Sequence, residues 1–390
     1  MPKSSRVLAS LTESKTVAIS DKVRQMKLEG IPVISLSNGE PDFGTEPAVC
    51  EAAIEAIRAG ETHYGDSRGL PVMRKAVVAK FLRENNIVYD PDREIVVTAS
   101  GKLALYISLL SILDPGDEVL ILEPAWVSYS ALVTLLGGVP VPVALDPADD
   151  FTLTREALQS AVSARTKAVI LNSPNNPSGR VLDGDEMSAL CGLVRERDLW
   201  LISDEIYEHL IYDGKKNISP ASLPGMREHC ITVNGMSKAY AMTGWRVGYI
   251  GSPMPHAAEV LKAQQHVITC APGFVQVAAA AALNGPQDYL ASMVGEYDQR
   301  RKAAVKALSA MPGVRCPMPS GAFYLLPEID FRGYDSWQLA DFLLEKARVA
   351  VTPGQAFAAR AVRNVRMSYA TGMDEILVAM DRIAEALAAG

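Results

Sequence analysis

A lysine follows an apolar segment in the middle of the chain, at a position where it could do chemistry. Residues 231–234 form the apolar run, Ser237 and Lys238 come just after it, and Arg246 lies eight positions beyond Lys238. A lysine amine forms an imine with an aldehyde, and burial lowers its pKa enough to make it nucleophilic. A surface lysine in a loop would give the same segment, so these residues alone leave both interpretations open.

A carboxylate follows the apolar run 199–203 in the same way. Asp204 would be costly to bury at the end of a strand without a partner. The ring nitrogen of a pyridine cofactor is one such partner, because the negative charge keeps that nitrogen protonated and the ring then accepts electrons from a carbanion. Tyr207 is three residues further on, close enough to present its hydroxyl to the same ring. A helix N-cap is the simpler interpretation of Asp204 taken alone.

A small polar segment precedes a predicted helix. The backbone N–H groups of Ser100, Gly101 and Lys102 would form an anion site at the start of that helix. Ser237 and Arg246 could complete a site for a phosphate monoester, with Arg246 as a bidentate donor. Lys102 could equally be a solvated lysine at a helix start, so each part of this site is weak evidence by itself.

Short apolar runs recur through the middle of the chain and are bounded by polar, glycine or proline residues. Near-continuous apolar runs separated by amphipathic stretches predict a mainly parallel sheet covered by helices. Ligands on such sheets bind beyond the carboxyl ends of the strands, where the polar segments 100–102, 172–177, 204–207 and 237–238 lie. The predicted strands are 94–98, 118–122, 167–171, 199–203, 231–234 and 247–250, and a helix is predicted at 102–113.

The last hundred or so residues show a different pattern. A long helix at 289–308, a short strand at 322–326 and a helix at 336–346 predict a smaller α+β domain. We therefore expect an N-terminal segment at 1–45 that packs with the small domain, a large domain at 46–284 and a small C-terminal domain at 285–390.

The bulk composition argues against several classes of function. A formal net charge of -7 disfavours sequence-independent binding to nucleic acid and to anionic membranes. The most apolar stretch, 271–283, is too short to cross a bilayer. The five cysteines contain no C-x-x-C pair and the five histidines show no ligand spacing, so neither a disulfide framework nor a metal site is expected. Residues 1–20 lack the apolar core of a signal peptide, and we expect a cytoplasmic protein with reduced thiols.

Several motifs together resemble one family over nearly the whole chain. The chain resembles the fold-type I, pyridoxal-phosphate-dependent aminotransferases of class I. The resemblance implies a large α/β domain with a mainly parallel seven-stranded sheet between helices, plus a smaller α+β domain. The segments that carry it are 38–43 (NGEPDF), 64–69 (YGDSRG), 173–179 (SPNNPSG), 203–207 (SDEIY), 237–238 (SK), 244–248 (GWRVG) and 366–370 (RMSYA).

The resemblance implies a role for individual residues toward pyridoxal 5′-phosphate. Lys238 would be the Schiff-base lysine and the acid–base group, Asp204 would pair with the ring nitrogen, and Tyr207 with Asn176 would donate to the phenolic oxygen. Trp126 would stack on the ring, although a core tryptophan is the simpler interpretation of this residue alone. The residues implied to hold the phosphate are Ser100, Gly101, Lys102, Ser237, Arg246 and, from a neighbouring subunit, Tyr64.

The resemblance also implies substrate contacts and an assembly. Arg366 would bind the α-carboxylate as a fork-to-fork pair, helped by Asn176 and the backbone of Gly39, beside Trp126. Lys102 and Thr16 match residues that contact the distal carboxylate in the bacterial branch acting on aspartate and, in some members, prephenate. The placement of Tyr64 implies a homodimer with composite active sites.

The implied activity is transamination between an L-amino acid and a 2-oxo acid, with aspartate or another dicarboxylic donor and 2-oxoglutarate as the candidate pair. The alternative is a pyridoxal-phosphate-dependent lyase, cyclase or oxidase that uses the same deprotonated intermediate. Two departures bear on the substrate. Ser100 stands where the branch usually has glycine, and the segment 266–272 is more apolar than is usual there.

Overall fold

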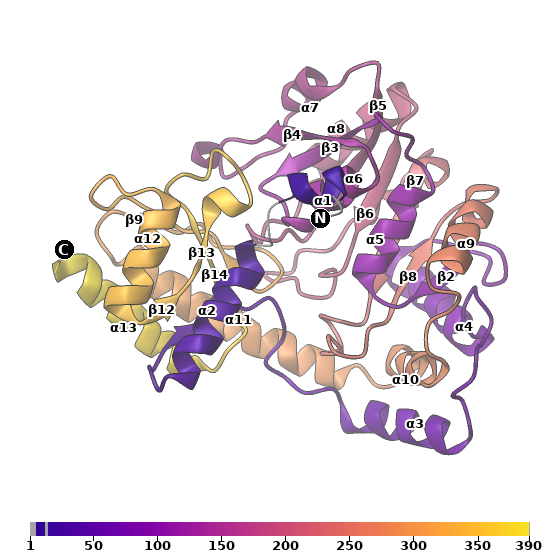
Figure 1. Ribbon diagram of the computed structural model, residues 1–390, viewed down its shortest axis with the longest axis horizontal. Helices are drawn as coiled ribbons and strands as arrows, with labels where there is room; N and C mark the ends of the chain where they lie inside the picture. Colours follow the sequence, from indigo (N-terminus) through magenta and orange to yellow (C-terminus); the bar gives the residue numbers. More distant parts are fainter. Residues whose placement is uncertain (1–4, 12–14, 390) are drawn as a thin grey trace.

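The computed structural model describes residues 5–11 and 15–389, and the side chains of residues 10, 15–18 and 20 lie outside that description. A central seven-stranded sheet has the strand order β2-β8-β7-β6-β5-β3-β4 (Figure 1). Strand β8 is antiparallel to both neighbours and the other pairs are parallel. The prediction of a mainly parallel seven-stranded sheet is confirmed. The strands are β2 Ile95–Thr98, β3 Glu118–Glu123, β4 Val139–Ala144, β5 Thr166–Asn172, β6 Trp200–Asp204, β7 Cys230–Gly235 and β8 Gly248–Gly251.

Strand β4 is the strand of this sheet that the sequence did not predict. It contains Pro140 and Pro142, and proline removes a backbone donor, which disfavours a central strand. The strand lies at the edge of the sheet, next to β3 alone, where a missing N–H is tolerated. The six predicted strands all exist, with ends that differ by at most one residue from the prediction.

Helices cover both faces of the sheet, as apolar runs on a parallel sheet require. Neighbouring strand residues point to opposite faces. Ile170 and Ile202 belong to one apolar cluster with helices α5, α6 and α9, whereas Val169 and Leu201 belong to another with α7 and α8. The helices of this part are α3 Pro47–Arg58, α4 Pro71–Lys80, α5 Gly101–Leu110, α6 Ser128–Leu135, α7 Arg155–Ala161, α8 Gly184–Glu196, α9 His256–Val267 and α10 Gly273–Asn284.

The C-terminal part is built on the long helix α11, Asp288–Ser309, and on small sheets. Strand β14, Val365–Ser368, lies between β10 and β13 and was not predicted, while the predicted strand at 322–326 shrinks to β10, Tyr324–Leu325. The predicted helix at 336–346 is α12, Ser336–Phe342, continued by a π-helical turn, Leu343–Ala347. The remaining elements are β9 Val314–Arg315, β11 Glu328–Ile329, β12 Val349–Ala350, β13 Thr352–Pro353 and α13 Met373–Ala389.

The N-terminal segment contacts this C-terminal part. Strand β1, Ile34–Ser35, pairs in parallel with β12, and Val23 of helix α2, Lys15–Leu28, packs in a small apolar cluster with Leu344 and Ala350. In Figure 1 the indigo helix α2 is drawn over the C-terminal part of the chain. Helix α1, Arg6–Ser10, precedes it. The three domain boundaries given above stay a prediction. In residues 5–11 and 15–389, no helix is long and apolar enough to cross a membrane.

Candidate active site

A cavity of about 510 Å³ opens beyond the carboxyl ends of the strands and collects most of the predicted site residues. It lies where ligands bind on parallel sheets. Segment 37–40 and strand β14 close it from the side of the C-terminal part. The predicted residues that line it are Gly39, Gly101, Lys102, Trp126, Asn176, Asp204, Tyr207, Ser237, Lys238, Arg246 and Arg366.

Lys238 is partly buried at the wall of this cavity. Its Nζ donates a hydrogen bond to the carbonyl oxygen of Gly39. Burial lowers the pKa of Lys238 to about 8, against the raising effect of Glu40, and Arg366 lowers it further. A larger fraction of this amine is therefore neutral near neutral pH than in an ordinary lysine, which suits it to react as a nucleophile and to accept a proton.

Asp204 is a buried carboxylate that lines the same cavity. Its Oδ2 accepts a 2.7 Å hydrogen bond from the hydroxyl of Tyr129, and its Oδ1 accepts a 3.3 Å bond from the backbone N–H of Ile206. Burial raises the pKa of Asp204 to about 6, while the bond from Tyr129 lowers it. The residues that follow, 206–209, form a turn and no helix, so the helix N-cap interpretation of Asp204 is wrong.

Two tyrosines and an asparagine lie around the same space. The hydroxyls of Tyr207 and Tyr324 are 2.9 Å apart, and both rings are buried. Asn176 is held by its backbone N–H, which donates to Oδ1 of Asn172 at 2.9 Å. These contacts fix Tyr207 and Asn176 at the cavity wall, where both can donate to an oxygen of a bound ligand.

Arg366 is a buried guanidinium on β14 whose partners are all neutral. It donates to Oδ1 of Asn176 at 3.1 Å, to the carbonyl oxygen of Ser37 at 2.7 Å and to Oγ1 of Thr352 at 3.4 Å. Its Nε has no hydrogen-bond partner, and in the described part of the chain no carboxylate forms an ion pair with it. Burying a charge without an opposite charge is costly, so this side chain is suited to receive a carboxylate from a ligand.

The start of helix α5 forms the opposite end of the cavity. Gly101 and Lys102 line it beside Ser237 and Arg246. Gly248 allows this approach, because a Cβ there would lie 2.5 Å from the backbone nitrogen of Gly101. The pKa of Lys102 is lowered by the loss of water at the cavity and by the nearby charge of Arg246. A helix start flanked by two cations is a site for a phosphate.

Two predicted residues, Ser100 and Tyr64, do not line the cavity, and a third lies outside the described side chains. Ser100 caps α5 by accepting a 3.1 Å bond from Leu103 N–H, so its side chain supports the helix start and does not line the cavity. Tyr64 is 88% exposed and lies outside the cavity of its own chain. Thr16 is in α2, and its side chain lies outside the part of the chain that the structure describes.

Several residues of the cavity wall were not predicted as site residues, among them Tyr129, Asn172 and Tyr324. Tyr129 comes three residues after Trp126, and its ring packs edge-on against that indole with centroids 5.5 Å apart. Asn172 ends β5, and its Nδ2 donates to the carbonyl oxygen of Asp204 at 3.0 Å. The available signal was the position just after a strand, which Asn172 shares with Asp204.

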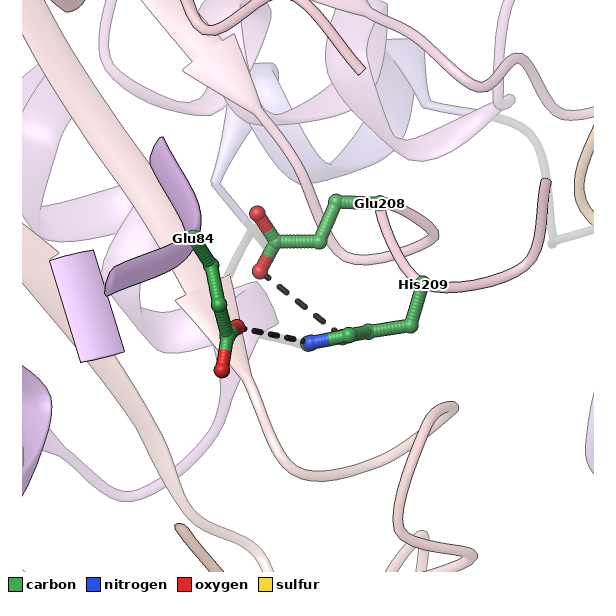
Figure 2. Close-up of side chains that lie close together, drawn as sticks. All are labelled: Glu84, Glu208 and His209. Carbon is green, nitrogen blue, oxygen red and sulfur yellow. Dashed lines mark hydrogen bonds and ion pairs between the residues drawn. The ribbon is translucent and has the colours of Figure 1, made fainter. Parts of the chain in front are cut away.

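An ion-pair cluster lies next to the turn that follows Asp204. Glu84, Glu208 and His209 lie close enough to hold a metal ion (Figure 2). His209 Nε2 is 2.8 Å from Glu84 Oε2. The ammonium of the fully buried Lys80 contacts Glu208 and lies 3.7 Å from Glu84, so a lysine supplies the positive charge here. Asn234 Nδ2 also donates to Glu208, which fixes the segment that carries Tyr207.

We expect Lys80→Met to destabilise the protein strongly. Removing the ammonium leaves the buried Glu208 carboxylate without its lysine partner, which costs about 3–5 kcal/mol of unfolding free energy. Urea unfolding at fixed protein concentration measures this loss. Lys262→Met is the matched control, because Lys262 pairs with Glu259 on the surface and its loss should cost about 1 kcal/mol or less. Equal losses in the two variants would mean that the buried pair contributes no more than a surface pair.

The sequence of the chain matches a known protein family. The chain belongs to the family of class I and II aminotransferases, whose family model matches residues 31–386. The protein is therefore an enzyme that exchanges amino and oxo groups between amino acids and oxo acids.

Individual relatives agree with this membership and carry different substrate names. The chain is 42% identical over 375 residues to an aspartate aminotransferase of Musicola paradisiaca (strain Ech703), covering 96% of this chain and 94% of the relative. It is 41% identical to an aspartate/prephenate aminotransferase of Cereibacter sphaeroides, with 96% and 95% covered. Among solved structures, the aromatic aminotransferase of Pyrococcus horikoshii has a TM-score of 0.89 at 42% identity, with 95% and 99% covered.

Proposed function

We propose that the chain transfers the amino group of an L-amino acid to a 2-oxo acid with pyridoxal 5′-phosphate as cofactor, and that aspartate or another dicarboxylic amino acid is the donor with 2-oxoglutarate as acceptor. The observation that carries the proposal is Arg366, a buried guanidinium without a carboxylate partner among the described residues, in one cavity with Lys238 and Asp204. This arrangement gives an α-amino acid a site for its carboxylate and gives its α-carbon a base.

The residues of the cavity fit the proposed cofactor. Asp204 accepts two hydrogen bonds, whereas a carboxylate has about four acceptor positions. Asp204 can therefore accept one more N–H, and a protonated ring nitrogen would supply that donor together with an opposite charge. At the other end, the start of α5 with Ser237 and Arg246 suits a phosphate. Lys238 is the amine in between, and Trp126 lines the wall beside Lys102.

Each residue of the cavity would then have a separate role in the reaction. The bound cofactor supplies an electron sink for negative charge at the substrate α-carbon. Lys238 Nζ would take the proton from that carbon and return it at C4′ of the cofactor, and a pKa of about 8 would let the amine do both near neutral pH. Arg366 and Asn176 hold the α-carboxylate, which orients the α-proton toward Lys238. Tyr207 donates to an oxygen on the ring.

The charges of the cavity support a dicarboxylic substrate. Lys102, Lys238, Arg246 and Arg366 line it, against the carboxylates of Asp204 and Glu40, in a chain whose formal net charge is -7. In this proposal Lys238 and Arg246 serve the cofactor and Arg366 serves the α-carboxylate, which leaves Lys102 for a second carboxylate. Lys102 lies over the Trp126 ring, with Nζ 4.8 Å from its centroid, so its ammonium is held at the mouth of the site. A second substrate carboxylate can reach it there.

We expect Lys102→Ala to weaken dicarboxylic donors far more than monocarboxylic ones. Losing one partly exposed ion pair should lower kcat/KM for aspartate about 10- to 100-fold, mainly through KM, and change the value for alanine or phenylalanine less than about threefold. Steady-state kinetics with both donor classes measure the difference. An equal loss for both donor classes would mean that Lys102 contacts the phosphate or only stabilises the fold. The control is Lys75→Ala, because Lys75 is on α4 and does not line the cavity.

The reaction itself is tested by a half-reaction. The purified enzyme with bound cofactor is mixed with an amino acid alone, and the cofactor absorbance is followed. Conversion to the amino form of the cofactor, reversed by a 2-oxo acid, supports the proposal. Ammonia release without any need for a 2-oxo acid contradicts it and favours elimination chemistry. A panel of amino donors against one acceptor then identifies the donor.

The assembly and the location of the protein belong to the same proposal. Tyr64 is 88% exposed, as expected of a side chain that completes the phosphate site of a second subunit, which supports a homodimer with composite sites. The cysteines of the described residues are all free thiols, which suits a cytoplasmic protein. The mass in solution tests the dimer, and mixing inactive Tyr64 and Lys238 variants tests whether subunits share their sites.

A further inference from the structure

A tyrosine outside the predicted cofactor contacts is bonded to the carboxylate that should meet the cofactor ring. The hydroxyl of Tyr129 donates to Oδ2 of Asp204 at 2.7 Å, and both side chains are buried, with exposures of 2% and 5%. A hydrogen bond to an ionised group is among the stronger ones in proteins. Nothing in the proposed chemistry uses Tyr129 directly, so its role has to be sought in what it does to Asp204.

The bond spans three neighbouring strand ends. Tyr129 is in the first turn of α6, after β3, and Asp204 ends β6, while β5 lies between these two strands. Asn172 at the end of β5 donates to the backbone carbonyl oxygen of Asp204 at 3.0 Å. The carboxylate is thus fixed through its side chain by Tyr129, and its backbone is fixed by Asn172.

The tyrosine is itself held so that it can only act as a donor. Its backbone N–H donates to the carbonyl oxygen of Trp126 at 3.0 Å, and its ring packs edge-on against the Trp126 indole at an angle of 87°. Burial, and then the charge of Asp204, hold the pKa of Tyr129 well above its usual range. The phenol therefore keeps its proton at all working pH values and presents it to Asp204.

We propose that Tyr129 is a positioning residue that orients the Asp204 carboxylate and stabilises its charged form, so that Asp204 can hold a protonated ring nitrogen. This inference rests on the proposed function. The charged and titratable groups that act on Asp204 are Tyr129, which donates to it, and Lys238, whose charge favours the carboxylate; Tyr207 lies nearby. Of these, Tyr129 is the side chain that bonds to the carboxylate.

The test is Tyr129→Phe in the enzyme with bound pyridoxal 5′-phosphate. Loss of a charge-assisted bond should raise the cofactor dissociation constant and lower kcat, each by about 10- to 100-fold. The pKa of the imine between Lys238 and the cofactor, measured by absorbance, should rise. A ring nitrogen that is protonated less of the time withdraws less electron density from the imine. Tyr89→Phe is the matched control: Tyr89 is buried, and its hydroxyl lies 3.3 Å from Thr232, outside the cavity. It should change neither readout.

A second background separates an effect through Asp204 from a merely structural one. In an Asp204→Ala enzyme, adding Tyr129→Phe should leave the cofactor dissociation constant unchanged, because the acceptor is gone. An equal rise in both backgrounds, or no rise in the wild-type background, would overturn the inference. A wild-type enzyme that does not bind pyridoxal 5′-phosphate would instead overturn the proposed function, so the two failures give different results.

Discussion

The Lys238→Ala variant should lose transamination by at least about four orders of magnitude, the upper end of what a general acid–base group contributes. It removes the amine that is bonded to the Gly39 carbonyl at the cavity wall. The same variant should lose the visible absorbance of cofactor linked covalently to the protein. Steady-state rates and an absorbance spectrum near neutral pH measure both effects.

The control for this prediction is a surface lysine outside the cavity lining. Lys262→Ala removes an exposed side chain that is paired with Glu259, and it should leave both the rate and the spectrum unchanged. A Lys238→Ala enzyme that keeps its catalytic rate would contradict the central claim. Far-ultraviolet circular dichroism should match the wild type, because Lys238 makes no ion pair within the described residues.

The second large effect is expected from Arg366→Leu. Removing the buried partner of a substrate carboxylate costs about 2–5 kcal/mol, so kcat/KM for α-amino acids should fall by roughly two to four orders of magnitude. The loss should depend on the carboxylate. In the half-reaction, an amine that lacks this group should react equally slowly with the variant and with the wild type.

Two further variants sharpen this result. Arg366→Lys keeps the charge but loses the forked pair of donors, so it should recover only part of the rate. Arg363→Leu is the control, because Arg363 is exposed and paired with Asp330. If Arg366→Leu slowed the amine as much as the amino acid, the arginine would have a structural role through Asn176 and Ser37.

The central sheet could be predicted because its strands are continuous apolar runs that end in polar residues. Lys238 and Asp204 stood out for the same reason, since a charged group directly after a buried strand requires an explanation. Strand β4 was not predicted because its two prolines disfavour a strand. Its position at the edge of the folded sheet makes the missing backbone donors acceptable.

Other parts of the site depend on contacts between distant segments. Arg366 was recognised only through the resemblance, because nothing around it in the sequence indicates that it is buried between the rings of Tyr324 and Phe357. Tyr129 was missed because its partner, Asp204, is 75 positions away in the chain. The capping role of Ser100 was not predicted, because the sequence does not show that its hydroxyl accepts a bond from Leu103 N–H; its place at the phosphate stays a prediction.

The carbonyl oxygens of segment 37–39 have a consequence for ligand discrimination. Ser37 accepts a bond from Arg366 and Gly39 accepts one from Lys238, so the protein's own backbone competes with every ligand for both groups. A carboxylate wins this exchange because its bond to a guanidinium is charge-assisted, whereas a neutral amide only replaces one carbonyl oxygen by another. Amino acid amides and other neutral analogues should therefore bind weakly, because they do not displace the backbone carbonyl oxygens of Ser37 and Gly39 from Arg366 and Lys238.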